Sequence, residues 1–184
     1  MKREGAFKIL NEKVKKENLI RHSLAVEAVM RALARHFGED EEVWGLAGLL
    51  HDLDFEETEN DWTKHGILIG EWLKDSDLPK EIFDIIKAHN SDILGTPRNT
   101  RAEKAIFAVD PLTGLITASA LMMPDKKISL LKTKSVLKRF KVTGFAKGAN
   151  REFIRSCIDF DMELPEFIDI SLKAMQNVDS ELGL

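Results

Sequence analysis

The chain has 184 residues, a formal net charge of −4 and one cysteine. This length suits one domain with one hydrophobic core, and the lone Cys157 excludes a framework of internal disulfide bonds. The acidic balance, without an aromatic pattern beside the basic residues, argues against a nucleic-acid partner. The N-terminal residues lack the apolar core of a signal peptide, so we expect a cytoplasmic protein.

The first helix of interest carries a histidine on its apolar face. Apolar residues recur at three- and four-residue intervals around His22: Leu19, Val26, Val29 and Leu33. We therefore expect His22 to point inward. His36 lies near the end of the same helix, beside Gly38, and we interpret it as a helix-terminal residue rather than a ligand.

A second helix is predicted to begin in the acidic run 40–42 and to end at the adjacent pair His51-Asp52. Neighbouring residues on a helix differ in direction by about 100°, so both side chains can reach one site beside the helix end. Further along, His65 opens an apolar run and His89 closes another apolar helix.

The segment from Ala105 to Met123 is strongly apolar and nearly long enough to cross a membrane. It contains Asp110, and a charge buried among apolar residues needs a partner or a metal ion. Thr100 and Glu103 form a capping-box pattern at its start. We therefore expect a buried, kinked helix inside a protein core, with no membrane as a partner.

Helical patterns also cover the remainder of the chain, at residues 128–140, 149–158 and 164–182. Strand signals are nearly absent, because the chain has no tyrosine and no Asn-Gly or Asp-Gly hairpin sequence. We predict an all-α fold, a single compact domain over residues 1–184. A metal-ligand core, residues 18–123, is expected to carry the packed C-terminal helices, residues 126–184. The apolar face around Phe167 allows core packing or a homodimer.

Four histidines and two aspartates stand in an order that favours a metal site: His22, His51, Asp52, His65, His89 and Asp110. The chain has five histidines, so this set uses all but one of them. A single histidine on an apolar face is more often an ordinary core residue, so the prediction depends on the whole set. Mixed nitrogen and oxygen ligands suit Fe, Mn, Co, Ni or Zn better than Ca. We predict one or two divalent transition metal ions.

The pattern of His22, the His51-Asp52 pair and Asp110 resembles the HD superfamily of metal-dependent phosphohydrolases. Two strings are similar to its first two motifs: RHSLAV at residues 21–26 and GLLHD at residues 48–52. The string VDPLTGL around Asp110 resembles a small subgroup described as predicted HD hydrolases. The resemblance implies an HD-domain-like helical bundle.

The resemblance also implies an activity. His65 and His89 look like the additional ligands of binuclear members, so a binuclear metal site is expected. The implied function is hydrolysis of a small phosphorylated substrate, most simply a nucleotide or related phosphoester, by metal-activated water. Two alternatives stay open: a di-iron oxygenase, which a few relatives with the same six ligands are, and a non-catalytic nucleotide-binding module.

Residues near the ligands are candidates for catalysis and substrate binding. Asp52 is the expected bridge between two ions, because a carboxylate has two oxygens to share. Many relatives have a cation after the His-Asp pair, whereas this chain has acids, and we predict that Asp54 or Glu56 orients water or moves a proton. The predicted substrate contacts are Arg21, Lys64 and Asn90.

Overall fold

The structure is a computed structural model that describes all of residues 1–184, and it contains helices and no strand. The α-helices are α1 (Arg3–Lys13), α2 (Glu17–Phe37), α3 (Glu41–Leu50), α4 (Phe55–Thr58), α5 (Leu68–Trp72), α6 (Lys80–His89), α7 (Ser91–Leu94), α8 (Arg101–Leu121), α9 (Thr133–Phe140), α10 (Arg151–Arg155), α11 (Leu164–Gln176) and α12 (Asp179–Leu182). Two 3-10 turns, η1 (Ile128–Leu130) and η2 (Ser156–Phe160), complete the set. The predicted all-α class is confirmed.

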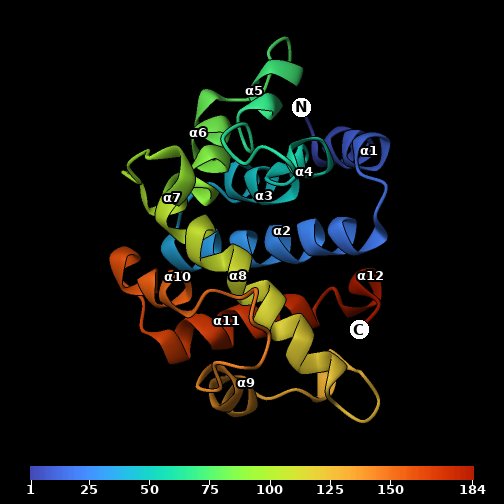
Figure 1. The fold of residues 1–184 in the computed structure, drawn as a ribbon, viewed down its shortest axis with the longest axis vertical. Coiled ribbons are helices and arrows are strands. Elements are labelled where there is room, and N and C mark those ends of the chain that lie inside the picture. The colour runs from blue at the N-terminus through green and yellow to red at the C-terminus, as the bar shows by residue number, and fades with distance from the viewer.

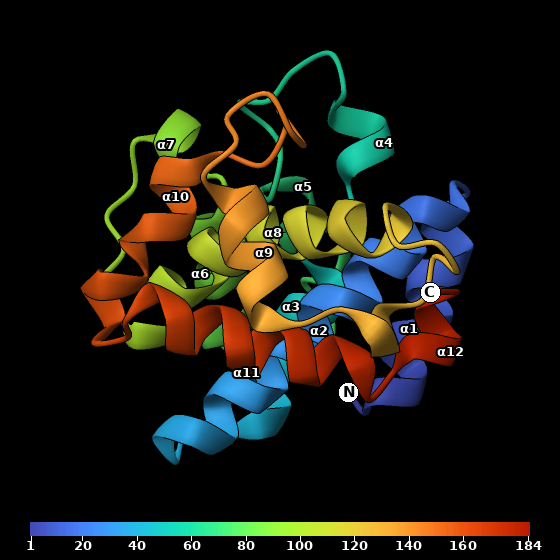
Figure 2. The same cartoon turned by 90° about the horizontal axis from the view of Figure 1, so that it is seen from below.

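Helix α2 runs through the middle of the molecule and contacts α3, α8 and α11 (Figure 1). The N-terminal helices α1 and α3 to α6 lie on one side of it, and α9 to α12 lie on the other. Seen from below, α11 runs alongside α2, in agreement with the contacts between these two helices (Figure 2). The C-terminal helices therefore pack against the helices that carry the candidate ligands.

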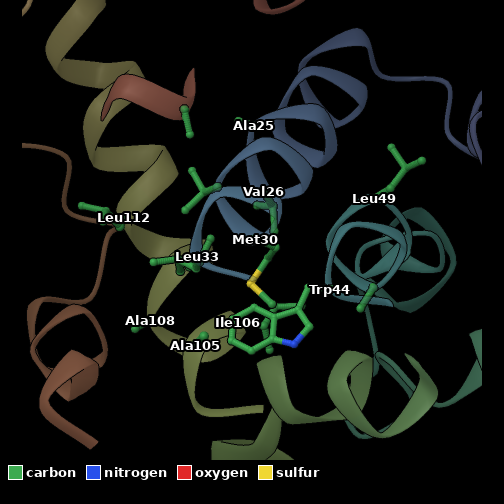
Figure 3. Close-up of a cluster of buried hydrophobic side chains, with 14 of the residues drawn as sticks. Ala25, Val26, Met30, Leu33, Trp44, Leu49, Ala105, Ile106, Ala108 and Leu112 are labelled. Atoms are coloured by element: carbon green, nitrogen blue, oxygen red, sulfur yellow. The ribbon is translucent and has the colours of Figure 1, made fainter. Parts of the chain in front are cut away.

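The core forms where α2, α3 and α8 meet (Figure 3). On α2, Val26, Met30 and Leu33 are fully buried, at the spacing of one helix face. Trp44 of α3 and Ile106 of α8 close the cluster from the other helices. Each such apolar side chain contributes about 1.5–3 kcal/mol when buried, so this junction is a rigid base for the ends of the helices.

Helices α2 and α3 approach each other closely at Gly48. A β-carbon at this position would lie 3.0 Å from the Cα of Glu27 and 3.1 Å from the backbone carbon of Val26. Real β-carbons rarely come so close to backbone, so glycine allows the contact. The contact brings the C-terminal end of α3 against α2, near His22.

Helix α8 begins with the predicted capping box. The Thr100 hydroxyl accepts the N–H of Glu103 at 3.2 Å, and the Glu103 carboxylate accepts the N–H of Thr100 at 3.4 Å. The helix continues through Pro111. It is long and apolar enough to cross a membrane by length and composition, but most of its apolar window is buried inside the fold. As expected, α8 is a buried core helix.

The C-terminal helices are more broken than the apolar patterns predicted. Residues 128–140 contain η1 and α9, separated by extended backbone at Leu131 and Lys132. The side-chain amide of Gln176 donates to the carbonyls of Ile128 and Leu131, at 3.0 and 3.1 Å. This long-range partner satisfies backbone groups that a continuous helix would have paired. Similarly, residues 149–158 divide between α10 and η2, and residues 164–182 between α11 and α12.

Candidate metal centre

Six side chains from five segments of the chain converge on one site, and all of them except the fully buried His51 line a cavity. His22 comes from α2, His51 and Asp52 directly follow α3, His65 precedes α5, His89 ends α6, and Asp110 lies in α8. These are the six residues predicted as ligands, and the structure brings all of them together.

Asp52 lies between two groups of histidines. Its Oδ2 is 3.6 Å from Nε2 of His22 and 3.4 Å from Nε2 of His51. Its Oδ1 is 3.3 Å from Nε2 of His65 and 3.6 Å from Nε2 of His89. Within each group, the potential ligand atoms lie within 4.8 Å of one another. The carboxylate therefore presents one oxygen to each group.

Asp110 belongs to the side of His22. Its Oδ1 lies 3.0 Å from Nε2 of His22 and 4.0 Å from Nε2 of His51. Its side chain keeps 34% exposure, whereas that of Asp52 keeps 9%. Asp110 is thus the more open of the two carboxylates and borders the cavity.

The outer nitrogen of each of the four imidazoles is held by a neighbouring group. Two of them contact backbone carbonyls through Nδ1: His51 contacts that of Gly48 at 2.9 Å, and His89 contacts that of Ile86. The other two contact side chains through Nδ1: His65 contacts Oδ1 of Asp54 at 2.9 Å, and His22 contacts Oγ1 of Thr113 at 3.2 Å. The Thr113 hydroxyl donates to the Asp110 carbonyl, so it accepts from His22. An imidazole that donates from Nδ1 has its lone pair on Nε2. All four Nε2 atoms therefore turn toward Asp52, as in metal-binding histidines held by outer hydrogen bonds.

Three imidazole nitrogens in the cluster lack a suitable partner within the protein and fit a metal ion better. Nε2 of His51 is buried without any hydrogen-bond partner. Nε2 of His65 lies 2.8 Å from Nε2 of His89, which places two acceptor atoms against each other unless a proton or a metal ion intervenes. Imidazole nitrogens with carboxylate oxygens form a donor set that suits divalent transition metals. The residues present thus fit a metal centre.

The electrostatics of the cluster differ between its histidines. Burial opposes protonation of His65, but its hydrogen bonds to Asp52 and Asp54 outweigh burial and raise its pKa to about 9. Burial and the nearby His51 and His65 lower the pKa of His89 to about 4. Burial opposes the charged form of Asp52, yet the surrounding histidines hold its pKa well below its usual range. The cluster therefore favours an ionised Asp52 beside a protonated His65 when no metal is bound.

The two predicted acid-base residues lie outside the cavity. Asp54 is fully buried behind His65, where Oδ1 accepts the imidazole N–H and Oδ2 accepts the N–H of Gly66, each at 2.9 Å. Glu56 accepts the backbone N–H of Lys15 at 2.6 Å and so joins α4 to the loop before α2. Neither carboxylate reaches the position predicted for orienting water. Asp54 instead fixes a ligand.

Only one of the three predicted substrate contacts lies at the cavity. Asn90 lines the cavity, although its side-chain amide donates to the carbonyls of Trp62 and His65 at 2.8 and 3.1 Å. Lys64 is exposed and pairs with Asp61, outside the cavity. Arg21 pairs with Glu17 at 2.6 Å and borders a neighbouring cavity. The structure therefore brings only Asn90 to the metal centre.

The cavity has a volume of about 640 Å³. Its lining comprises Leu19, His22, Asp52, Phe55, Trp62, His65, His89, Asn90, Ile93, Asp110, Pro111, Gly114, Ala146, Gly148, Ala149, Asn150 and Phe153. A second cavity of about 620 Å³, between α2, α8 and the C-terminal residues, shares His22 and Gly114 with it. The metal-ligand residues occupy one part of the first cavity and aromatic and aliphatic side chains occupy much of the rest.

One wall of the cavity comes from the loop between α9 and α10. The Arg151 guanidinium holds this loop by donating to the carbonyls of Phe140, Val142, Phe145, Ala146 and Ala149. This wall was not predicted from the sequence, and neither were the outer hydrogen bonds of Thr113 and Gly66. For Gly66 a signal existed, because a glycine follows His65 directly, and the structure gives it a φ of 81°.

A comparison with protein-family models matches residues 19–124 to the HD domain. The matched region contains all six candidate ligands and most of the cavity. No curated protein and no solved structure matches the chain.

Proposed function

Because the chain belongs to the HD domain family, we propose that it is a metal-dependent phosphohydrolase acting on a small phosphorylated molecule, such as a nucleotide or related phosphoester. The observation that carries the proposal is the arrangement of four imidazole Nε2 atoms around one buried carboxylate, Asp52. Divalent metal ions bound there would lower the pKa of a water molecule and polarise a phosphoryl group.

We infer a binuclear centre in which Asp52 is shared. Its Oδ2, with His22, His51 and Asp110, would hold one ion, and its Oδ1, with His65 and His89, would hold the second. The support is the division of the ligand atoms into two groups that meet only at this carboxylate.

The remaining polar residues have positioning roles in this proposal. Asp54 fixes the ring of His65, and Thr113 fixes the ring of His22, so that each presents the same nitrogen to the centre. Asn90 ties the loop before His65 to the end of α6 through two carbonyl contacts. Phe55, Trp62 and Phe153 would place apolar surface against the body of a bound substrate.

One observation favours a second candidate function, a di-iron oxygenase. No lysine or arginine lines the cavity, so an uncharged oxidisable molecule fits its wall at least as well as a polyanion. This function requires bound iron and O₂ consumption that depends on a substrate, whereas hydrolysis requires neither.

The first test is the metal content of protein purified without chelator or a nickel column. About two ions per chain, with metal-dependent phosphate release from a phosphoester panel, would support the proposal. The Asp52→Ala variant should lose metal and turnover while its circular dichroism stays helical. Iron with substrate-dependent O₂ uptake and no phosphate release would favour the oxygenase. Failure to bind any metal after reconstitution would overturn both.

A further inference from the structure

The wall of the metal-centre cavity is apolar and lacks cationic side chains. Beyond the ligands, it is built mainly from Leu19, Phe55, Trp62, Ile93, Pro111 and Phe153. Its charged members are the ligands themselves, with the carboxylates Asp52 and Asp110 among them. An anionic substrate would therefore find positive charge only at bound metal ions.

The nearby cations do not compensate for this lack. Lys64 pairs with Asp61 at 3.0 Å, away from the cavity. Arg21 borders the adjoining cavity, but its guanidinium is paired with Glu17. Lys147 lies between two residues of the wall, yet its own side chain is exposed and does not line the cavity.

The aromatic part of the wall is held in place but remains accessible. The ring of Trp62 makes edge contacts with Phe55 and His65, with centroids 5.4 and 5.2 Å apart. Its side chain nevertheless stays 40% exposed. A large aromatic ring that is braced and only partly covered suits stacking against a flat group of a ligand.

We propose that this cavity selects a molecule with a single phosphoryl group on an uncharged, flat, apolar body, and that it rejects di- and triphosphates. The inference rests on the proposed binuclear metal centre. Two divalent ions would carry four positive charges, and the carboxylates of Asp52 and Asp110 would neutralise two of them. The two charges that remain match the two negative charges of one phosphomonoester dianion. A triphosphate would bring further negative charges against an apolar wall that offers them no partner.

Binding of phosphonates that cannot be hydrolysed tests the selection without relying on turnover. Calorimetry on metal-loaded protein would compare the affinities for methylene analogues of adenosine mono-, di- and triphosphate. Methylphosphonate, which has the phosphonate group but no nucleoside, is the reference probe. We expect the monophosphate analogue to bind at least about tenfold more tightly than the triphosphate analogue. Equal or tighter triphosphate binding would overturn the inference.

Variants separate the contributions of stacking and charge. Trp62→Ala should lower the affinity for the adenosine monophosphonate by about tenfold and leave the affinity for methylphosphonate unchanged. The reason is that stacking on an aromatic side chain affects only the flat body of the ligand, which methylphosphonate lacks. Lys147→Ala should leave all affinities within about twofold, since this side chain is not part of the wall. Triphosphate binding that depends on Lys147, or equal losses for both probes in Trp62→Ala, would contradict the inference.

The proposed function and the inference fail in different ways. If the metal-loaded protein binds none of these phosphonates and releases no phosphate from any ester, the phosphohydrolase proposal is wrong and the inference falls with it. If it hydrolyses triphosphates in preference to monophosphates, the proposed function stands and only the inference is wrong. Unchanged metal content in Trp62→Ala would confirm that this variant reports on substrate binding.

Discussion

The Nε2 atoms of His65 and His89 lie 2.8 Å apart, although the Nδ1 of each ring is already held by an outer acceptor. Two lone pairs facing each other at this distance repel unless something positive binds them. Without metal, a proton on His65 meets this need, because its hydrogen bonds to the buried carboxylates outweigh burial and raise its pKa to about 9. A metal ion would take the place of that proton.

Removal of one histidine should eliminate one of the two proposed metal positions. His89→Ala deletes a ligand of only the second proposed ion, so metal content should fall from about two ions per chain to about one. Elemental analysis of the purified variant measures this directly. His36→Ala is the matched control, because His36 lies at the end of α2 near Glu166 and away from the cluster, and its metal content should not change. Loss of both ions in His89→Ala would contradict two separable positions.

Metal affinity should rise with pH. The pKa of His65 is raised to about 9, so at pH 6 to 8 the metal-free protein holds a proton on this ring that metal binding must displace. The same protonation stabilises the metal-free fold below pH 6.5, and this contribution is lost as pH rises through about 9. Calorimetry in two buffers of different ionisation enthalpy should detect proton release at pH 7. Metal binding with no proton release and no pH dependence would exclude this exchange.

Asp54 should act on the metal through His65. In Asp54→Asn the side chain keeps its size but loses the charge that accepts from the His65 ring and from the N–H of Gly66. Metal affinity should fall by about 10–100-fold, the usual effect of losing an outer partner of a ligand histidine. The pH dependence should also become shallower, because the remaining neighbours hold the proton of His65 less strongly. Glu57→Gln is the control, since this neighbouring carboxylate is exposed.

The ligands could be predicted because they depend on residue type, order and helical periodicity. His22 lies on the apolar face of α2, and the His51-Asp52 pair follows a helix that begins with a capping aspartate, Asp40. Such local rules also predicted the start of α8 at Thr100. Such local rules are sufficient to predict a site residue wherever the direction of its side chain follows from the helix that carries it.

The roles of the residues after Asp52 could not be predicted in this way. Asp54 lies two residues after Asp52 but turns away from the cavity, because the loop returns behind it and presents the N–H of Gly66, at a φ of 81°. The wall around Ala146 depends on carbonyl contacts to Arg151, and a sequence pattern does not specify such loop contacts. These features follow from tertiary packing rather than from local periodicity.

The close approach of α2 and α3 provides a prediction about stability. In Gly48→Ala the new β-carbon would meet the backbone of Glu27 at 3.0 Å, and neither helix can move without disturbing the core between them. We expect a loss of about 1–3 kcal/mol in the free energy of unfolding, the usual cost of overpacking. Urea denaturation of the metal-free protein measures it.

Gly70→Ala is the matched control for this change. Gly70 lies within α5, and a β-carbon there would have no neighbour within 4 Å. Alanine is a better helix former than glycine by about 1 kcal/mol, so this variant should be as stable as the parent protein or slightly more stable. If the free energy of unfolding falls in Gly48→Ala and rises in Gly70→Ala, the space at the α2–α3 contact, and not helix propensity, determines the stability of Gly48→Ala. Because the contact also places His51 beside His22, Gly48→Ala should weaken metal binding as well, whereas Gly70→Ala should not. A Gly48→Ala protein with unchanged stability and metal affinity would mean that the two helices tolerate a wider separation.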